Sequence, residues 1–106
     1  MSKYKNVKTT VDGIAFDSKK EGARHGELQL LAKAGAIQDL RLQVPFELIP
    51  KQAGERAVKY VADFTYTENG KMIVEDTKSD ITRANPTYIL KRKLMLWVHG
   101  IRIREV

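Results

Sequence analysis

The chemistry suggested by this sequence centres on two aspartates. Asp63 and Asp76 lie in two strand-like runs, residues 60–66 and 72–78, which Asn69-Gly70 separates. Asn-Gly between β-branched and aromatic runs is the strongest short-range signal for a hairpin with a two-residue turn. With that turn, the register places Asp63 directly opposite Asp76.

Two opposed carboxylates on a hairpin are costly unless a cation lies between them. Directly opposed residues have Cβ atoms roughly 4.5–5.5 Å apart, and two carboxylates about 5 Å apart repel by about 3 kcal/mol at an effective dielectric constant near 20. Because side chains alternate along a strand, Lys78 shares the face of Asp76, whereas Glu75 and Thr77 point the other way. Two acids and a lysine on one face suit Mg²⁺, which takes oxygen ligands and uses one or two carboxylates beside substrate phosphates. The alternative is a strand surface of mixed charge, on which an Asp near a Lys is a solvated ion pair of small energy.

These residues resemble the core motif of the PD-(D/E)xK nuclease superfamily, in which an acidic residue is followed further along the chain by (D/E)-x-K. Asp63 and Asp76-Thr77-Lys78 match that pattern, although Ala62 stands where the proline of the motif would be. The superfamily places a helix with a glutamate before these strands and another helix after them, which matches Glu21 and residues 86–99. The match covers most of the chain, which is similar to small phage-encoded endonucleases, some of them described as Holliday junction resolvase-like.

The resemblance implies a Mg²⁺-dependent DNA endonuclease that hydrolyses phosphodiester bonds and leaves a 5′-phosphate and a 3′-hydroxyl group, with Mn²⁺ able to replace Mg²⁺. It implies that the metal ligands are Asp63, Asp76, the Thr77 carbonyl and Glu21. Lys78 would deprotonate or orient the attacking water. Branched DNA is the substrate form that the resemblance suggests, and a homodimer would let two sites cut two strands. The implied location is the cytoplasm of a phage-infected or prophage-carrying bacterial cell.

Glu21 has two competing explanations. Ser18 followed three residues later by Glu21 is a capping box, in which the serine oxygen and the glutamate carboxylate satisfy the first free amides of a helix. The resemblance implies instead a carboxylate that binds a cation or orients water, and one carboxylate is not expected to serve both its own cap and a distant metal. Glu27 should face elsewhere on this helix, and a solvated or DNA-facing side chain is expected for His25.

This first helix is predicted to end before Gly35. Its apolar stripe is predicted from five residues: Ala23, Leu28, Leu30, Leu31 and Ala34. A later helix is predicted from Asn85 as N-cap and Pro86 as first residue to Gly100. Six of its apolar residues are expected to pack on the sheet: Ile89, Leu90, Leu94, Leu96, Trp97 and Val98. Trp97 in particular is expected in the core.

Four residues are candidates for contact with nucleic acid: Lys91, Lys93, Arg83 and Gln43. The superfamily places a Lys or Gln of the later helix beside the catalytic pocket, so the resemblance favours Lys91, with Lys93 and Arg83 as weaker candidates. Gln43 begins a strand and would reach a phosphate. For each of them, the alternative is a side chain that simply faces water.

The remaining segments complete an α/β pattern. They are expected to form a small hairpin over residues 11–16 with its turn at Asp12-Gly13, a short connection over 37–42, an edge-proximal strand over 43–50, a polar loop over 51–56 and a last strand over 101–106. This order predicts an α/β fold with a mixed central β-sheet flanked by helices. The resemblance refines it to a restriction-endonuclease-like core.

Composition limits the classes of function. A chain of 106 residues is expected to form one nuclease domain over 1–106, with residues 1–10 as a flexible basic arm or an edge strand. The absence of cysteine excludes a disulfide framework, a thiolate zinc site and a thiol nucleophile. Without an apolar run long enough to span a membrane or a signal-peptide core, a cytoplasmic protein is expected, with no membrane partner and no small-molecule cofactor.

Net charge favours an anionic partner. The formal charge is +6, which suits DNA. Two alternatives to a DNA nuclease remain open. One is a non-catalytic nucleic-acid-binding domain whose paired acids anchor an ion or a salt-bridge network, and the other is a ribonuclease with the same site.

Overall fold

The computed structural model describes residues 9–11 and 14–106, and these form an α/β fold. The central sheet has the strand order β3-β4-β5-β6, with β3 (Gln38–Ile49), β4 (Val58–Glu68), β5 (Lys71–Asp76) and β6 (Arg104–Glu105). Strands β3, β4 and β5 are antiparallel, and β6 is parallel to β5. The predicted class, a mixed sheet flanked by helices, is confirmed.

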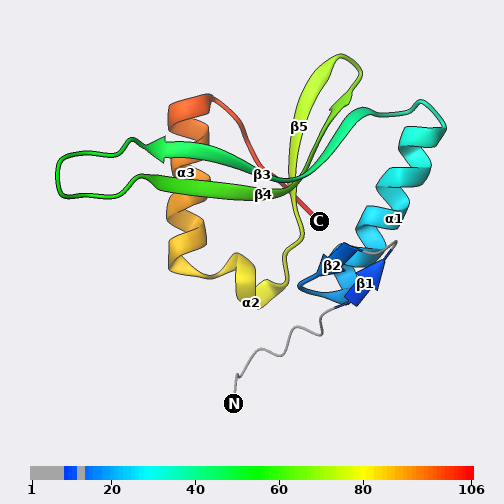
Figure 1. Ribbon diagram of the computed structural model, residues 1–106, viewed down its shortest axis with the longest axis horizontal. Coiled ribbons are helices and arrows are strands. Elements are labelled where there is room, and N and C mark those ends of the chain that lie inside the picture. Colours follow the sequence, from blue (N-terminus) through cyan, green and yellow to red (C-terminus); the bar gives the residue numbers. More distant parts are fainter. Residues whose placement is uncertain (1–8, 12–13) are drawn as a thin grey trace.

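The other elements lie around this sheet. They are β1 (Thr9–Val11), β2 (Ile14–Phe16), α1 (Lys19–Lys33), α2 (Asp80–Arg83) and α3 (Pro86–His99). Figure 1 shows α1 and α3 far apart in the view, on either side of β5, with β3 and β4 extending across α3. In the described part of the chain, no helix is long and apolar enough to cross a membrane.

The β4–β5 hairpin has the predicted register. Glu68 pairs with Lys71, and the ladder continues to the pair of Phe64 and Glu75. Asn69 and Gly70 between the strands both have positive φ, 52° and 76°. Asn-Gly is favoured in a type I′ turn because both of its central residues require positive φ.

Strand β3 is longer than predicted, and its ladder with β4 is interrupted in the middle. The expected connection over 37–42 is wrong, because Gln38–Leu42 already belongs to β3. Along the interrupted part, Leu42 pairs with Phe64 and Val44 pairs with Ala62, whereas Gln43, with φ 52°, makes no pair. The pairing that is skipped is the one that would set Gln43 opposite Asp63. Figure 1 shows β3 and β4 changing direction in this central region.

Two hydrophobic clusters hold the helices against the sheet. On the side of α3 the buried residues are Leu48, Tyr60, Ala62, Val74, Tyr88, Met95 and Ile103. On the side of α1 they are Phe16, Leu28, Ile37, Phe64 and Tyr66, with Leu40 and Leu42 packed against them. The second cluster explains the longer β3, since the alternating leucines at 40 and 42 pack with the core beneath α1.

Only one of the five residues in the predicted apolar stripe of α1, Leu28, is buried. Leu30 is exposed to 67%, and Ala23, Leu31 and Ala34 are also exposed, whereas the buried residues of this helix are Glu21, Gly22, His25 and Leu28. His25 is therefore neither solvated nor DNA-facing. Its ring is buried 5.0 Å from that of Phe16 and 6.1 Å from that of Phe64. The helix ends as predicted, with Gly35 at φ 77° after the C-cap Ala34.

The prediction that six apolar residues of α3 pack on the sheet is wrong for four of them. Trp97, expected in the core, is 84% exposed, and Leu90, Leu96 and Val98 are exposed as well. The buried residues of α3 are Tyr88 and Met95. The ends of α3 are as predicted. The Asn85 side chain accepts a hydrogen bond from the Tyr88 amide, Pro86 begins the helix, and Gly100 is its left-handed C-cap.

The N-terminal predictions are only partly within the described residues. Residues 1–8, most of the predicted basic arm, lie outside them, as do the turn residues Asp12 and Gly13 of the predicted hairpin. The strands of that hairpin are present, since β1 and β2 pair in antiparallel orientation. Sequence reasoning missed α2, a single turn in which the Ser79 hydroxyl and the Thr82 side chain form a capping box.

Candidate active site

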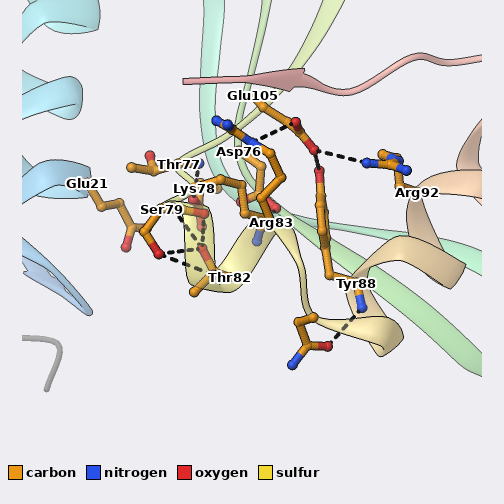
Figure 2. Close-up of polar contacts among 12 residues, drawn as sticks. Glu21, Asp76, Thr77, Lys78, Ser79, Thr82, Arg83, Tyr88, Arg92 and Glu105 are labelled. Carbon is orange, nitrogen blue, oxygen red and sulfur yellow. Dashed lines mark hydrogen bonds and ion pairs between the residues drawn. The ribbon is translucent and has the colours of Figure 1, made fainter. Parts of the chain in front are cut away.

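One pocket brings together all four predicted catalytic residues. Glu21, Asp63, Asp76 and Lys78 line it, and Thr77 lies between the last two. Glu21 comes from the first turn of α1, Asp63 from the middle of β4, and Asp76 from the end of β5. Figure 2 shows Glu21 approaching from the side of α1 toward the segment that follows β5. Asp63 reaches this pocket from the position of β4 that has no pair in β3.

Lys78 is held between an acid and an aromatic ring. Its Nζ lies 3.0 Å from Asp76 Oδ2 and 4.1 Å from the centroid of the Tyr88 ring. An ammonium over an aromatic face is attracted by the ring quadrupole. The side chains of Asp76 and Lys78 therefore meet on one face, as strand alternation predicts, and the tyrosine restricts where the ammonium can go.

The Asp63 side chain accepts a backbone hydrogen bond just beyond the end of the β4–β5 ladder. The Thr77 amide donates a hydrogen bond of 2.8 Å to Asp63 Oδ2. The ladder between β4 and β5 ends just before this position, at the pair of Phe64 and Glu75. The carboxylate of Asp63 is thereby fixed beside Asp76, across the two strands.

Burial raises the pKa of Glu21, Asp63 and Asp76 in this pocket. Burial and the neighbouring Asp63 carboxyl group together raise the pKa of Asp76 to about 7, and the Lys78 ammonium opposes the change. Burial is also the main cause that raises the pKa of Asp63, and the nearby Glu21 adds to it. The pKa of Glu21 is raised chiefly by burial. A bound cation would favour the ionised form of each acid.

Glu21 serves both its helix cap and the pocket. Its amide donates to Ser18 Oγ (3.1 Å), which is one half of the predicted capping box. Its carboxylate is divided, because Oε1 accepts from the Asp17 amide (3.3 Å) and Oε2 accepts from Gln43 Nε2 (3.1 Å). The amide bonded to Oε1 belongs to Asp17, the residue before the N-cap, and not to Ser18 as a complete capping box requires.

The pocket offers a divalent cation two carboxylates, not a complete set of protein ligands. Among the residues that the structure describes, no group of three or more His, Cys, Asp or Glu is arranged to hold a metal ion. Asp63 and Asp76 remain as two hard oxygen ligands, the number of carboxylates that Mg²⁺ commonly uses. The buried Thr77 Oγ1 beside them has no hydrogen-bond partner. A cation bound here would compete with Lys78 for Asp76.

The four candidates for contact with nucleic acid divide into two pairs. Gln43 and Lys91 line a pocket that also includes Asp63, Asp76 and Lys78. Lys93 and Arg83 line neither this pocket nor the one that contains Glu21. The Arg83 guanidinium is engaged by Glu105 at 3.1 Å and by Asp80 at 3.7 Å.

Comparison with known proteins identifies a family but no activity. The model of the family described as "Protein of unknown function (DUF1064)" matches residues 1–101. The chain belongs to the DUF1064 family. No curated protein and no solved structure matched the chain. Function in this DUF1064 protein is therefore inferred from the geometry of the site.

Sequence reasoning missed the residues that position Lys78 in the DUF1064 chain. The Tyr88 hydroxyl donates to Glu105, whose carboxylate also meets Arg83 and Arg92, and Figure 2 shows this carboxylate joined to Tyr88 and Arg92. The Lys20 ammonium donates to the Lys78 carbonyl at 2.7 Å. The sequence gave one signal for the role of Tyr88, its position one helical turn before Lys91. The contact with Glu105 could not be predicted, because Glu105 lies on β6, far from α3 in the sequence.

A second buried acid lies beside the site but faces α1. Glu75 accepts two hydrogen bonds from Arg24, at 2.8 Å from Nε and 2.9 Å from Nη2, and a third from the Tyr66 hydroxyl. Arg104 in turn donates to the Tyr66 oxygen at 3.2 Å. This network joins α1, the helix that carries Glu21, to the middle of the sheet.

Proposed function

We propose that this DUF1064 protein is a Mg²⁺-dependent endonuclease that hydrolyses phosphodiester bonds in DNA. The observation that supports the proposal is the convergence of Glu21, Asp63, Asp76 and Lys78 on one pocket, where burial raises the pKa of all three acids. Strongly perturbed acids with a specific cationic neighbour in a cleft are typical of functional sites. The match to the (D/E)-x-K pattern adds to this support.

Asp63 and Asp76 would hold the cation, with the Thr77 carbonyl as a third oxygen ligand and Mn²⁺ as a substitute for Mg²⁺. When bound, a divalent cation polarises a phosphoryl oxygen and makes water a better nucleophile at neutral pH. Phosphate oxygens of the substrate would complete the ligand set, which is usual for Mg²⁺ sites with only one or two protein carboxylates.

The chain's own side chains have separate roles in the reaction. Water attacks the phosphorus, the bond to the 3′ oxygen breaks, and the leaving oxygen is protonated to a 3′-hydroxyl while the phosphate stays on the 5′ side. Lys78 would donate a hydrogen bond to the phosphate as negative charge develops there. Glu21, oriented by Gln43, would accept a hydrogen bond from the attacking water. Lys91 would contact a neighbouring phosphate.

The charge of the chain is consistent with DNA as the partner. A net charge of +6 favours a phosphate backbone. A homodimer would supply two such sites, which suits the cutting of both strands in a branched or linear duplex.

One observation favours a second candidate, a non-catalytic nucleic-acid-binding domain. Within residues 9–11 and 14–106, no three acids or histidines form a ready metal group, and Asp76 is already paired with Lys78. In such a domain the ion pair would serve to close the pocket. Its nucleic-acid binding would survive EDTA and the loss of Asp63.

Cleavage of end-labelled DNA separates these functions. A four-way junction, a matched linear duplex and an RNA duplex are incubated with and without Mg²⁺, with the wild type and with Asp63→Asn. The proposal predicts metal-dependent cutting of DNA that Asp63→Asn abolishes while DNA affinity is kept, and the ratio of junction to duplex rates reports the preferred form. Cutting of RNA alone would establish the ribonuclease, and intact binding without any cutting would establish the binding domain.

A further inference from the structure

The outer face of α3 carries exposed apolar side chains that neither the core nor the proposed active site uses. Trp97 is 84% exposed and Leu90 is 58% exposed. They are seven residues apart and therefore lie on one side of the helix, with the exposed Lys93 between them. Tyr88 and Met95, also seven residues apart, form the opposite, buried side. A largely exposed indole beside a second exposed apolar side chain indicates a surface that binds something.

The positive charge of α3 indicates that its outer face binds a polyanion rather than a second copy of the chain. The charged residues of α3 are Lys91, Arg92 and Lys93, with His99 in its last turn, and the helix contains no Asp or Glu. Packing two such helices against each other would bring like charges together with no acid on either helix to offset them.

Area leads to the same conclusion. The exposed apolar side chains of α3 are Leu90, Leu96, Trp97 and Val98. Together they offer roughly 450 Å² of surface, whereas a stable dimer buries about 800 Å² on each partner. Stacking of a nucleobase needs only one aromatic face and is sequence-tolerant, because every base has a π-face. A nearby lysine supplies the cation that such sites place along the backbone.

We propose that Trp97 stacks on an unpaired base of single-stranded DNA, with Leu90 and Lys93 beside it. The choice of DNA as partner rests on the proposed function. Trp97 follows Tyr88 by nine residues, about 13 Å along the helix axis, and lies on the opposite side of α3, so the stacked base would lie across this helix from the pocket that contains Lys78. The preferred substrate would then be DNA with an unpaired strand that extends several nucleotides beyond the bond that is cut.

The test uses the intrinsic fluorescence of the protein. The chain contains one tryptophan, so its emission reports on Trp97 alone. The wild type is titrated in EDTA with an oligo-dT strand of about 12 nucleotides, and saturable quenching is expected. With the same strand carrying a fluorescent label, Trp97→Ala should weaken binding at least about fivefold. Leu30→Ala removes an apolar side chain of α1 that is 67% exposed and should leave the affinity unchanged.

Two results would overturn the stacking proposal. One is absent quenching, or an affinity for oligo-dT that Trp97→Ala leaves within twofold of the wild type. The other is a concentration-dependent dimer in sedimentation that Trp97→Ala dissociates, since a second copy would then cover the face. Because EDTA prevents cutting in these measurements, they fail or succeed independently of the proposed nuclease activity, which the Asp63→Asn cleavage assay tests alone.

Discussion

Glu75 and Asp76 are consecutive buried acids on β5, and the structure treats them in opposite ways. Glu75 faces α1 and accepts three hydrogen bonds, two from Arg24 and one from Tyr66. Asp76 faces the pocket, where its cationic partner is the single ammonium of Lys78 and the pKa of its carboxyl group is raised to about 7. The first acid is fully paired, and the second is left short of positive charge.

The cationic partners of the two acids suit different roles: the pair of Glu75 and Arg24 suits a structural role, and the pair of Asp76 and Lys78 suits the proposed reaction. A guanidinium matches a carboxylate with two parallel hydrogen bonds in a fixed geometry, whereas an ammonium is a compact point charge on a flexible stem. Arg24 therefore suits a permanent joint between α1 and the sheet. Lys78 suits a site where the ammonium can leave Asp76 for a phosphate oxygen while a metal ion takes its place.

Removal of Lys78 is expected to have the largest effect on cleavage. Lys78→Met should lower the rate of cutting by about a thousandfold, because it deletes the charge that faces the phosphate in the transition state. Single-turnover cleavage of end-labelled duplex measures this effect. Lys33→Met, at the other end of α1, is the matched control and should stay within threefold of the wild type. A cleavage rate for Lys78→Met as high as that of the control would show that Lys78 takes no part in the reaction.

Removal of Glu75 should have the largest effect on stability. Glu75→Ala leaves the Arg24 guanidinium without its buried partner, and breaking such a pair typically costs about 3–5 kcal/mol. Urea unfolding measures the change. Glu27→Ala is the matched control because Glu27 pairs with the same arginine at 3.2 Å but its side chain is 64% exposed, so it should cost less than about 1 kcal/mol. Equal losses in both variants would contradict the assignment of Glu75 as the structural acid.

The raised pKa of Asp76 predicts a pH dependence of stability in metal-free buffer. The folded state holds a proton on Asp76 up to about pH 7, whereas the unfolded state loses it near pH 4. The stabilisation is therefore complete below about pH 4 and is lost as the pH rises through about 7. In EDTA, the free energy of unfolding should fall by on the order of 2 kcal/mol between pH 5 and pH 8.

Asp76→Asn is the control for this pH dependence, since other titrating groups remain in it. Its unfolding free energy should change less with pH than that of the wild type, and at pH 8 the variant should be the more stable protein. A wild type that becomes more stable from pH 5 to pH 8, with Asp76→Asn behaving in the same way, would show that Asp76 is not short of positive charge.

Tyr88 should have the smallest effect, through the position of Lys78. Tyr88→Leu removes the ring that lies 4.1 Å from the ammonium and should slow cleavage up to about thirtyfold, as a cation–π contact is worth roughly 0.5–2 kcal/mol. Tyr88→Phe keeps the ring and loses only the bond to Glu105, so its rate should stay within threefold. Rates are compared per folded molecule. Equal losses in the two variants would assign the effect to the hydroxyl group instead.

Local signals in the sequence predicted the elements that carry the site. The Asn69-Gly70 turn and the alternation after it set the register that brings Asp63 near Asp76, because turn chemistry and strand period depend on neighbouring residues only. The caps at Ser18, Asn85 and Gly100 were likewise predictable, since each satisfies backbone groups of its own helix.

The buried faces of the helices were not predictable from hydrophobic periodicity. The inward face of α1 carries Glu21 and His25, so a search for apolar stripes selected the exposed Leu30 instead. In α3 both faces carry apolar residues, and the buried Tyr88 packs in the core cluster and donates a hydrogen bond to Glu105 on a distant strand. The joint between Arg24 and Glu75 spans 51 positions of sequence, and no local pattern predicts such a pair.

The most direct test of the division between the two acids is to compare cleavage by Asp76→Asn and Glu75→Gln in Mg²⁺, with each rate corrected for the folded fraction. Asp76→Asn should lose more than about a thousandfold in rate although it is at least as stable as the wild type. Glu75→Gln should keep its rate per folded molecule within about tenfold of the wild type while losing stability. Near-normal cleavage by Asp76→Asn, or an equal loss of cleavage in both variants, would contradict the account.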